Sequence, residues 1–415
     1  MQIWENESFE LDQTDIEFLQ RHCGGLLERR IDGWAVTRLV GHISLPSGEI
    51  LHIKSRKASA ASLLGWLCYA DPTFSALRLL GRLPKVTDEG PLSAIVARLF
   101  LQETLRAANQ CGLIRNYQRR RVFSINVRGR IDFQKLIHRG GDLSKLPCIT
   151  WERVPHTPLN RFLSAAVKKI RSDQTMRIAC RTDMPKARAL FDGVQPMIDP
   201  RIMEGKEPLA RNERPFETTR TLARLILGQA WLREGRKLPG ESFLINLESL
   251  FERTVFKAFR EAGVDVTFKA PVRYTRIHTK NDKAVSSKIC MEMDLFLPNL
   301  KDGPVVVDSK YKTNLSSANL QQMVTYCFAA GANRAVLVFP EGFPFSQEEK
   351  QTCIFECPSR VNGEKDTIRI DVVQLETGAK DLAGWRSAAT KLAHDVLSTN
   401  SHREVCVRSV AFGSL

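Results

Sequence analysis

The chain has 415 residues, which corresponds to about two or three domains of ordinary size. Lys and Arg number 61 against 46 Asp and Glu, so the formal net charge is +15, and a polyanionic partner such as nucleic acid is favoured. The amino-terminal residues are polar and acidic, and no apolar run is long enough to cross a bilayer. We therefore expect a multidomain cytoplasmic protein without a membrane span.

Residues 1–150 are predicted to form an α+β region. Short strand-like runs at 34–36 and 50–54 alternate with helical stretches at 62–67 and 93–108. No single period dominates this part of the chain, which is typical of a mixed fold rather than a helical bundle.

A strongly basic stretch follows from residue 115 to residue 139 and includes Arg119, Arg120, Arg121 and Arg128. Part of it alternates between arginine and apolar residues as a strand does, which would place the arginines on one solvent face. A surface that contacts DNA phosphates and a solvated edge strand both fit this pattern, and the two interpretations stay open.

Residues 151–238 are predicted to be mainly helical. The apolar spacing at 158–171 and at 221–233 is that of amphipathic helices, whereas 191–215 is rich in Pro, Gly and charge and lacks periodicity. Glycines and a proline then punctuate the chain, and we expect a third region, 239–415, to begin there.

The third region has the predicted order helix, strands, helix, strand. Asn246 is a candidate N-cap for a first helix with one apolar stripe. The elements expected after it are strands at 264–268, 274–278, 290–297 and 305–311, a helix at 316–330 and a strand at 334–339.

Two aspartates and one lysine stand out in this region. The apolar run 305–307, typical of a strand buried on both faces, ends in Asp308-Ser309-Lys310. Residues two apart on a strand point the same way, so Asp308 and Lys310 are expected to face one side. Asp294 lies in the preceding strand-like run, and the turn-rich segment between the runs predicts a hairpin that brings Asp294 beside Asp308.

This trio suits hydrolysis of a phosphodiester. Two carboxylates at one point repel each other unless a cation lies between them, and Mg²⁺ prefers such oxygen ligands. Mg²⁺ held by Asp294, Asp308 and the backbone carbonyl of Ser309 would bind the scissile phosphate and activate a water, while Lys310 would orient that water or stabilise charge at phosphorus. A structural ion pair at a sheet end is the alternative, since the D-x-K tripeptide is common by chance.

The order of elements around these residues resembles the PD-(D/E)xK nuclease core, and the chain is more specifically similar to the McrC family, the nuclease subunits of McrBC modification-dependent restriction systems. The segment 247–252 is similar to that family's L-F-E helix, 307–312 to its D-x-K-Y-K strand, and 319–326 to its Q-x-x-x-Y helix. More diffuse likeness extends through 111–117, 127–131 and 157–161. At 53–58 the chain departs from the family, whose members often carry Pro-Lys there.

The resemblance implies an α/β restriction-endonuclease-like domain with a central mixed sheet flanked by helices, preceded by the α+β region and the helical middle. It also implies roles for three further residues. Glu252 would offer a third carboxylate to the metal, and Gln322 and Tyr326, one helical turn apart, would face the DNA. A surface glutamate beside the apolar stripe and an ordinary amphipathic helix are the alternatives.

The resemblance further implies a partner. No G-x-x-x-x-G-K-[ST] sequence occurs, so this chain is not expected to bind a nucleotide through a P-loop. A separate AAA+ GTPase of the McrB type would bind GTP and recognise modified DNA, while this chain, docked through region 1–150, stimulates the GTPase and cuts DNA within a hetero-oligomer in antiviral defence. A stand-alone nuclease of recombination or mobile-element processing and a non-enzymatic DNA-binding assembly subunit stay open.

The 10 cysteines are scattered, which favours reduced thiols packed in the core. Cys353 and Cys357 are close in sequence, but no second pair of Cys or His lies near enough to complete a tetrahedral zinc site. We favour packing over zinc binding for both.

Overall fold

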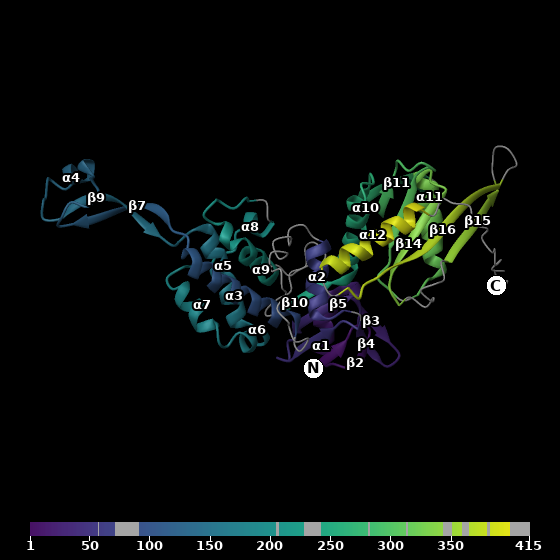
Figure 1. Ribbon diagram of the computed structural model, residues 1–415, viewed down its shortest axis with the longest axis horizontal. Coiled ribbons are helices and arrows are strands. Elements are labelled where there is room, and N and C mark those ends of the chain that lie inside the picture. The colour runs from purple at the N-terminus through teal and green to yellow at the C-terminus, as the bar shows by residue number, and fades with distance from the viewer. Residues whose placement is uncertain are drawn as a thin grey trace. The chain divides into compact units, whose positions relative to one another are not determined.

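The chain divides into two compact units in the computed structural model (Figure 1). The helical unit contains Gly41–His52 and Leu79–Leu244 together with Met1, and the sheet unit contains Gln2–Val40, Ile53–Arg78 and Ile245–Leu415. No described helix is long and apolar enough to span a membrane. The structure describes residues 1–56, 58–70, 91–204, 207–227, 242–280, 283–312, 314–342, 351–358, 365–379 and 382–398.

The boundary between the units runs through three strands, β5 (Leu39–Ser44), β6 (Ile50–Lys54) and β10 (Phe243–Asn246), so neither unit is one continuous stretch of sequence. The division of the chain into domains 1–150, 151–238 and 239–415, with the roles expected for them, stays a prediction. Glycine and proline report local turns, and they do not report which distant segments pack together.

The helical unit is built around α3, against which α6, α7 and α9 pack, and α5 packs on α6 and α9. The Thr157 hydroxyl accepts the backbone N–H of Asn160 at 3.1 Å and caps α5, as its sequence predicts. The helix expected at 221–233 begins earlier, and its last six residues lie outside the described residues. The bounds are α3 (Leu92–Cys111), α5 (Pro158–Ser172), α6 (Gln174–Ala179), α7 (Met184–Leu190), α8 (Pro200–Glu204) and α9 (Glu217–Leu227).

A small antiparallel sheet with the strand order β7-β9-β8 belongs to the same unit, and α4 packs on β9. The strand expected in the basic stretch is β7. Arg119, Arg120 and Arg121 are all exposed, so arginines occupy both faces of β7 rather than one, because successive strand residues point to opposite sides. The bounds are β7 (Asn116–Ser124), β8 (Arg130–Ile131), α4 (Phe133–His138) and β9 (Leu146–Val154).

The sheet unit is organised by a six-stranded mixed sheet in the order β11-β12-β13-β14-β16-β15. Strands β13, β14 and β16 are parallel, and the other neighbours are antiparallel. The mixed sheet is therefore confirmed. The bounds are β11 (Thr267–Lys280), β12 (Lys283–Leu297), β13 (Val305–Ser309), β14 (Arg334–Pro340), β15 (Gln351–Pro358) and β16 (Lys365–Leu375).

The prediction of two strands at 264–268 and 274–278 was wrong, because a single strand, β11, begins at Thr267 and continues through 274–278. It contains Pro271, which lacks the N–H of a ladder hydrogen bond. At the edge of a sheet, where β11 lies, a strand needs only one of its two sides for pairing, so the proline is tolerated.

Helices flank this sheet, as expected. Helix α11 (Ser317–Ala330) packs on β13, β14 and β16 with Met323 and Cys327 in the core, while α10 (Leu247–Glu261) contacts β13 and α12 (Leu382–Ser398) contacts β16. Asn246 caps α10, because its side-chain oxygen accepts the N–H groups of Glu248 at 3.0 Å and Ser249 at 3.2 Å. The run Val305–Ser309 is consequently buried on both faces.

The amino-terminal part of the sheet unit mixes strands and a helix around a sheet in the order β2-β4-β3, which agrees with the α+β expectation. Helix α2 packs on α10 and α12, where Trp66 stacks on Trp385 with ring centres 4.8 Å apart and donates to the Thr254 hydroxyl at 2.6 Å. The bounds are β1 (Gln2–Trp4), β2 (Ser8–Phe9), α1 (Gln13–Cys23), β3 (Leu27–Arg30), β4 (Gly33–Val36) and α2 (Ala60–Ala70).

Candidate active site

The carboxyl end of β13 brings the two predicted aspartates together. Strands β12 and β13 form the expected hairpin, with Leu295 paired to Val307, and the next step of this register places Asp294 opposite Asp308. Asp308 is only 1% exposed at the end of its apolar strand. A carboxylate buried in this way is unfavourable unless a cation or hydrogen-bond donors compensate it.

Lys310 supplies one such compensation. Its ammonium lies 2.6 Å from Oδ2 of Asp308, so the expectation that these two side chains face the same side is confirmed. The backbone N–H of Lys310 donates to the carbonyl of Val338 at 2.8 Å, which holds the chain beside β14 just after β13 ends. The ion pair is thus fixed by the sheet rather than by a mobile loop.

Ser309 supplies the compensation for Asp294. Both its backbone N–H, at 2.8 Å, and its hydroxyl, at 2.9 Å, donate to Oδ2 of Asp294. Two donors to one oxygen orient the carboxylate and leave Oδ1 for another ligand.

The three acidic groups of the site act on one another. Burial raises the pKa of Asp308, repulsion by Asp294 raises it further, and Lys310 opposes both. Burial raises the pKa of Glu252 on α10 to about 7, Asp294 adds to that shift, and Lys269 on β11 counteracts it. Repulsion among the three carboxylates therefore favours a bound proton or cation at this site.

Lys310 is suited to remain an ammonium. Burial alone would lower its pKa, but the attraction and hydrogen bond of Asp308 together with the charge of Asp294 outweigh burial, and the net shift is upward. For Lys312, two residues on, burial and the repulsion of Lys310 lower the pKa. The two lysines are therefore in different electrostatic environments even though they flank the same tyrosine.

Mg²⁺ fits the donor set of Asp294 and Asp308. It is commonly bound by one or two carboxylates and completes its shell with water and substrate oxygens. Within the part of the chain that the structure describes, no group of three or more His, Cys, Asp or Glu side chains is arranged to hold a metal ion. Glu252 is thus coupled to the aspartates by charge, and among the described residues it does not form a ligand cluster with them.

Gln322 and Tyr326 lie one turn apart on α11, as expected. The Gln322 amide donates to the Tyr326 hydroxyl at 2.8 Å, and that hydroxyl donates to the backbone carbonyl of Glu292 on β12, also at 2.8 Å. Tyr326 is 3% exposed, whereas Gln322 is half-buried. The tyrosine fastens α11 to the strand that carries Asp294.

Sequence reasoning missed the arginine at position 38. The Arg38 guanidinium donates to both carboxylate oxygens of Glu248 at 3.2 Å, and its carbonyl accepts the N–H of Leu247 at 2.9 Å. Its charge also lowers the pKa of Lys312. No motif surrounds Arg38, so only the fold reveals that it holds the first turn of α10.

Two other features lie apart from this trio. Cys353 on β15 is half-buried, its thiol is free, and burial raises its pKa. The side chain of Cys357 is outside the described residues.

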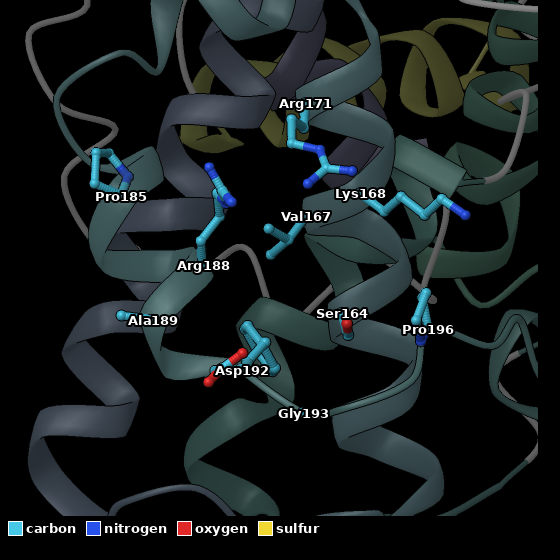
Figure 2. A pocket seen from close by; sticks show the side chains of 11 residues that line it. Ser164, Val167, Lys168, Arg171, Pro185, Arg188, Ala189, Asp192, Gly193 and Pro196 are labelled. Carbon is cyan, nitrogen blue, oxygen red and sulfur yellow. The ribbon is translucent and has the colours of Figure 1, made fainter.

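In the helical unit, an open groove of about 610 Å³ is lined by Lys168 and Arg171 of α5 and Arg188 of α7 (Figure 2). It contains none of the predicted catalytic residues.

These features define an α/β protein with an acidic, lysine-containing candidate active site at the end of a buried strand. The model of the McrBC family, described as the McrBC 5-methylcytosine restriction system component, matches residues 35–340, and the chain belongs to this family.

One solved structure supports the fold, and a second match is weaker. A chain from a half-complex of the tetradecameric assembly of Thermococcus gammatolerans McrB AAA+ hexamers with bound McrC is 16% identical, with 94% of this chain and 99% of that chain covered and a TM-score of 0.62. A chain of the Thermococcus gammatolerans McrBC complex is 17% identical, with 65% of this chain and 89% of that chain covered and a TM-score of 0.46. No curated protein matches the sequence.

Proposed function

We propose that this McrBC-family chain is the DNA-cleaving subunit of its restriction system and that its sheet unit is a PD-(D/E)xK nuclease. The observation that carries the proposal is the register of the β12–β13 hairpin, which sets Asp294 opposite Asp308 with Lys310 2.6 Å from the latter. A pair of carboxylates beside an ammonium suits metal-assisted phosphodiester hydrolysis, because the carboxylates can hold the metal and the ammonium can stabilise negative charge at phosphorus.

Each residue of the site has its own proposed role. Asp294 and Asp308 would hold Mg²⁺ together with the backbone carbonyl of Ser309, with Glu252 as a further acidic group beside them. When bound, Mg²⁺ supplies charge neutralisation at the scissile phosphate and lowers the pKa of a coordinated water. Lys310, kept protonated by Asp308, orients the attacking water and stabilises negative charge at phosphorus.

Burial of Asp308 supports the proposal that the site binds Mg²⁺. The strand places a carboxylate where water cannot solvate it, and a second carboxylate lies directly opposite. Gln322, which is half-buried and hydrogen-bonded to Tyr326 on α11, would contact DNA. Tyr326 acts through the position of β12.

We also propose that the chain works with a separate AAA+ GTPase that binds GTP and recognises modified DNA, and that it stimulates this GTPase. The family membership supports a two-component system, and the solved structure of similar fold is described as McrB AAA+ hexamers with bound McrC. A partner that reads the DNA would decide where this chain cuts.

The small sheet β7-β9-β8 with α4 supports a partner-binding role for the amino-terminal half. Among the residues that the structure describes, eight of the fifteen exposed large hydrophobic side chains lie here, and exposed apolar patches of this kind mark interaction surfaces. They are Tyr117, Phe123, Ile125, Val127, Phe133, Ile137, Leu143 and Trp151.

The test is cleavage of modified DNA by the full chain assembled with its AAA+ partner, GTP and Mg²⁺. We expect Asp308→Ala and Lys310→Ala to abolish cleavage while the GTPase stimulation persists, and Asp302→Ala, in the exposed turn of the hairpin, to cut normally. A normal rate for either site variant would overturn the assignment. Cutting without partner or nucleotide would support a stand-alone nuclease, and DNA binding without cutting would support an assembly subunit.

A further inference from the structure

Lys269 on β11 has a backbone conformation that lysine rarely adopts. Its φ is +52°, and only Asn6 and Arg38 share a positive φ among the other non-glycine residues that the structure describes. A side chain in this region crowds the backbone, so the conformation persists only where the surroundings impose it, and such strain concentrates at functional sites.

The strain lies directly across from a catalytic carboxylate. The β11–β12 ladder pairs Thr267 with Phe296 and Phe268 with Leu295, and it resumes with Ala270 and Met293. The skipped step is the one that places Lys269 opposite Asp294. The ladder is therefore interrupted at Lys269, which is also the residue with the left-handed backbone, and this position lies opposite Asp294.

The charge of Lys269 is available for a ligand. The side chain is exposed and its ammonium lies 5.8 Å from the centre of the Phe268 ring, but it forms no ion pair with any residue in the described part of the chain. It nevertheless lies close enough to Glu252 to lower the pKa of that carboxyl. The ammonium thus lies near the acidic groups of the site without forming an ion pair with any of them.

A site with three acidic groups repels a polyanion, and a cation at its edge offsets that repulsion. A compact ammonium recognises phosphate as a point charge. From the register, the strained backbone and the unpaired charge, we infer that Lys269 binds a DNA phosphate that flanks the scissile one and so positions the strand over Asp294 and Asp308. This inference rests on the proposed nuclease function.

Lys269→Asn and Lys269→Gly provide the sharpest test, because Asn and Gly tolerate a positive φ while both remove the ammonium. We expect each to lower the rate of DNA cleavage about tenfold, as for loss of one charge-assisted contact. Each should also reduce by about one the slope of log Kd against log salt for duplex DNA in EDTA. Lys269→Arg should retain most of both, and Lys301→Asn, in the exposed turn of the β12–β13 hairpin, should change neither.

A purely structural role makes the opposite prediction, since glycine relieves the strain and Lys269→Gly would then cut and bind as the wild type does. That result, with Asp308→Ala inactive in the same series, overturns the inference and leaves the proposed nuclease standing. If the wild-type complex does not cut at all, the nuclease proposal fails, and the salt slope alone then decides whether Lys269 contacts DNA.

Discussion

Ser309 donates two hydrogen bonds to the same oxygen of Asp294, one from its backbone N–H at 2.8 Å and one from its hydroxyl at 2.9 Å. Ser309 thereby links the β13 strand end to the carboxylate on β12. The middle residue of the D-x-K tripeptide has a geometric task of its own, although the tripeptide pattern leaves that position unspecified.

Ser309→Ala tests this task. The variant keeps the backbone donor and loses the hydroxyl, so Asp294 should be less well oriented while the fold remains intact. We expect cleavage by the assembled complex to slow about threefold to tenfold, which corresponds to the loss of about 1 kcal/mol from one hydrogen bond. Single-turnover cleavage measures the effect, and Ser309→Thr, which restores the hydroxyl, should recover it. An unchanged rate for Ser309→Ala would show that the backbone donor suffices.

Glu252→Gln should change how stability depends on pH. Burial first, and then Asp294, raise the pKa of Glu252 from 4.5 to about 7, so the folded state binds a proton more tightly than the unfolded state between these values. Stability of the wild type in EDTA therefore falls as pH rises from about 4.5 to about 7.

Glutamine does not titrate, so Glu252→Gln should gain about 1–2 kcal/mol relative to the wild type across this window, after allowance for its partial exposure. Denaturant unfolding at pH 4.5 and pH 8 in EDTA measures the difference, with Glu10→Gln at an exposed position as a control. Cleavage by Glu252→Gln should fall if the carboxylate serves the metal. A stability difference that does not vary with pH would refute the electrostatic account.

The aspartate–lysine geometry could be predicted from sequence because every step was local. An apolar run such as Val305 to Val307 predicts a strand buried on both faces, and the period of two then fixes which side Asp308 and Lys310 share. The hairpin connection is short, so Asp294 could be placed without knowledge of the rest of the fold.

The contributions of Lys269 and Arg38 could not be predicted in this way. Each is a single charged residue without a surrounding pattern, and its relevance depends on a positive φ and on partners fixed by the fold. The last two strands of the sheet, β15 and β16, were also missed, because β16 pairs in parallel with β14 across an intervening segment and its contacts are non-local.

Tyr326→Phe should separate a positioning role from a catalytic one. The variant loses the donor to the Glu292 carbonyl and the acceptor for Gln322, and it leaves the ring buried. We expect a loss of about 1–2 kcal/mol in the free energy of unfolding and a slower cleavage rate with unchanged dependence on pH. If the hydroxyl were a proton-transfer group, the pH profile of cleavage would change, which would contradict the positioning role.

The helical unit contains a buried hydrogen-bond network whose contribution to stability can be tested. His42 on β5 contacts Asp173 through Nε2 at 2.8 Å and Ser93 on α3 through Nδ1 at 2.9 Å, and all three side chains are buried. Asp173 also accepts the N–H of Met176 at 2.9 Å and so caps α6. This network joins a strand and two helices that are distant in sequence.

Asp173→Ala should lower the free energy of unfolding by about 3 kcal/mol at neutral pH, because it leaves the buried imidazole without its partner. Burial alone would raise the pKa of Asp173, but the hydrogen bond and charge of His42 outweigh it and the net shift is downward. An acid whose pKa is lowered in the folded state stabilises the protein at pH values above its ordinary pKa, and this contribution is lost as pH falls through the folded pKa.

The difference in the free energy of unfolding between wild type and Asp173→Asn should therefore shrink below about pH 4. Denaturant unfolding across pH 3 to pH 7 measures it, with exposed Asp192→Asn as the control, and a difference that grows toward low pH would contradict the assigned pairing.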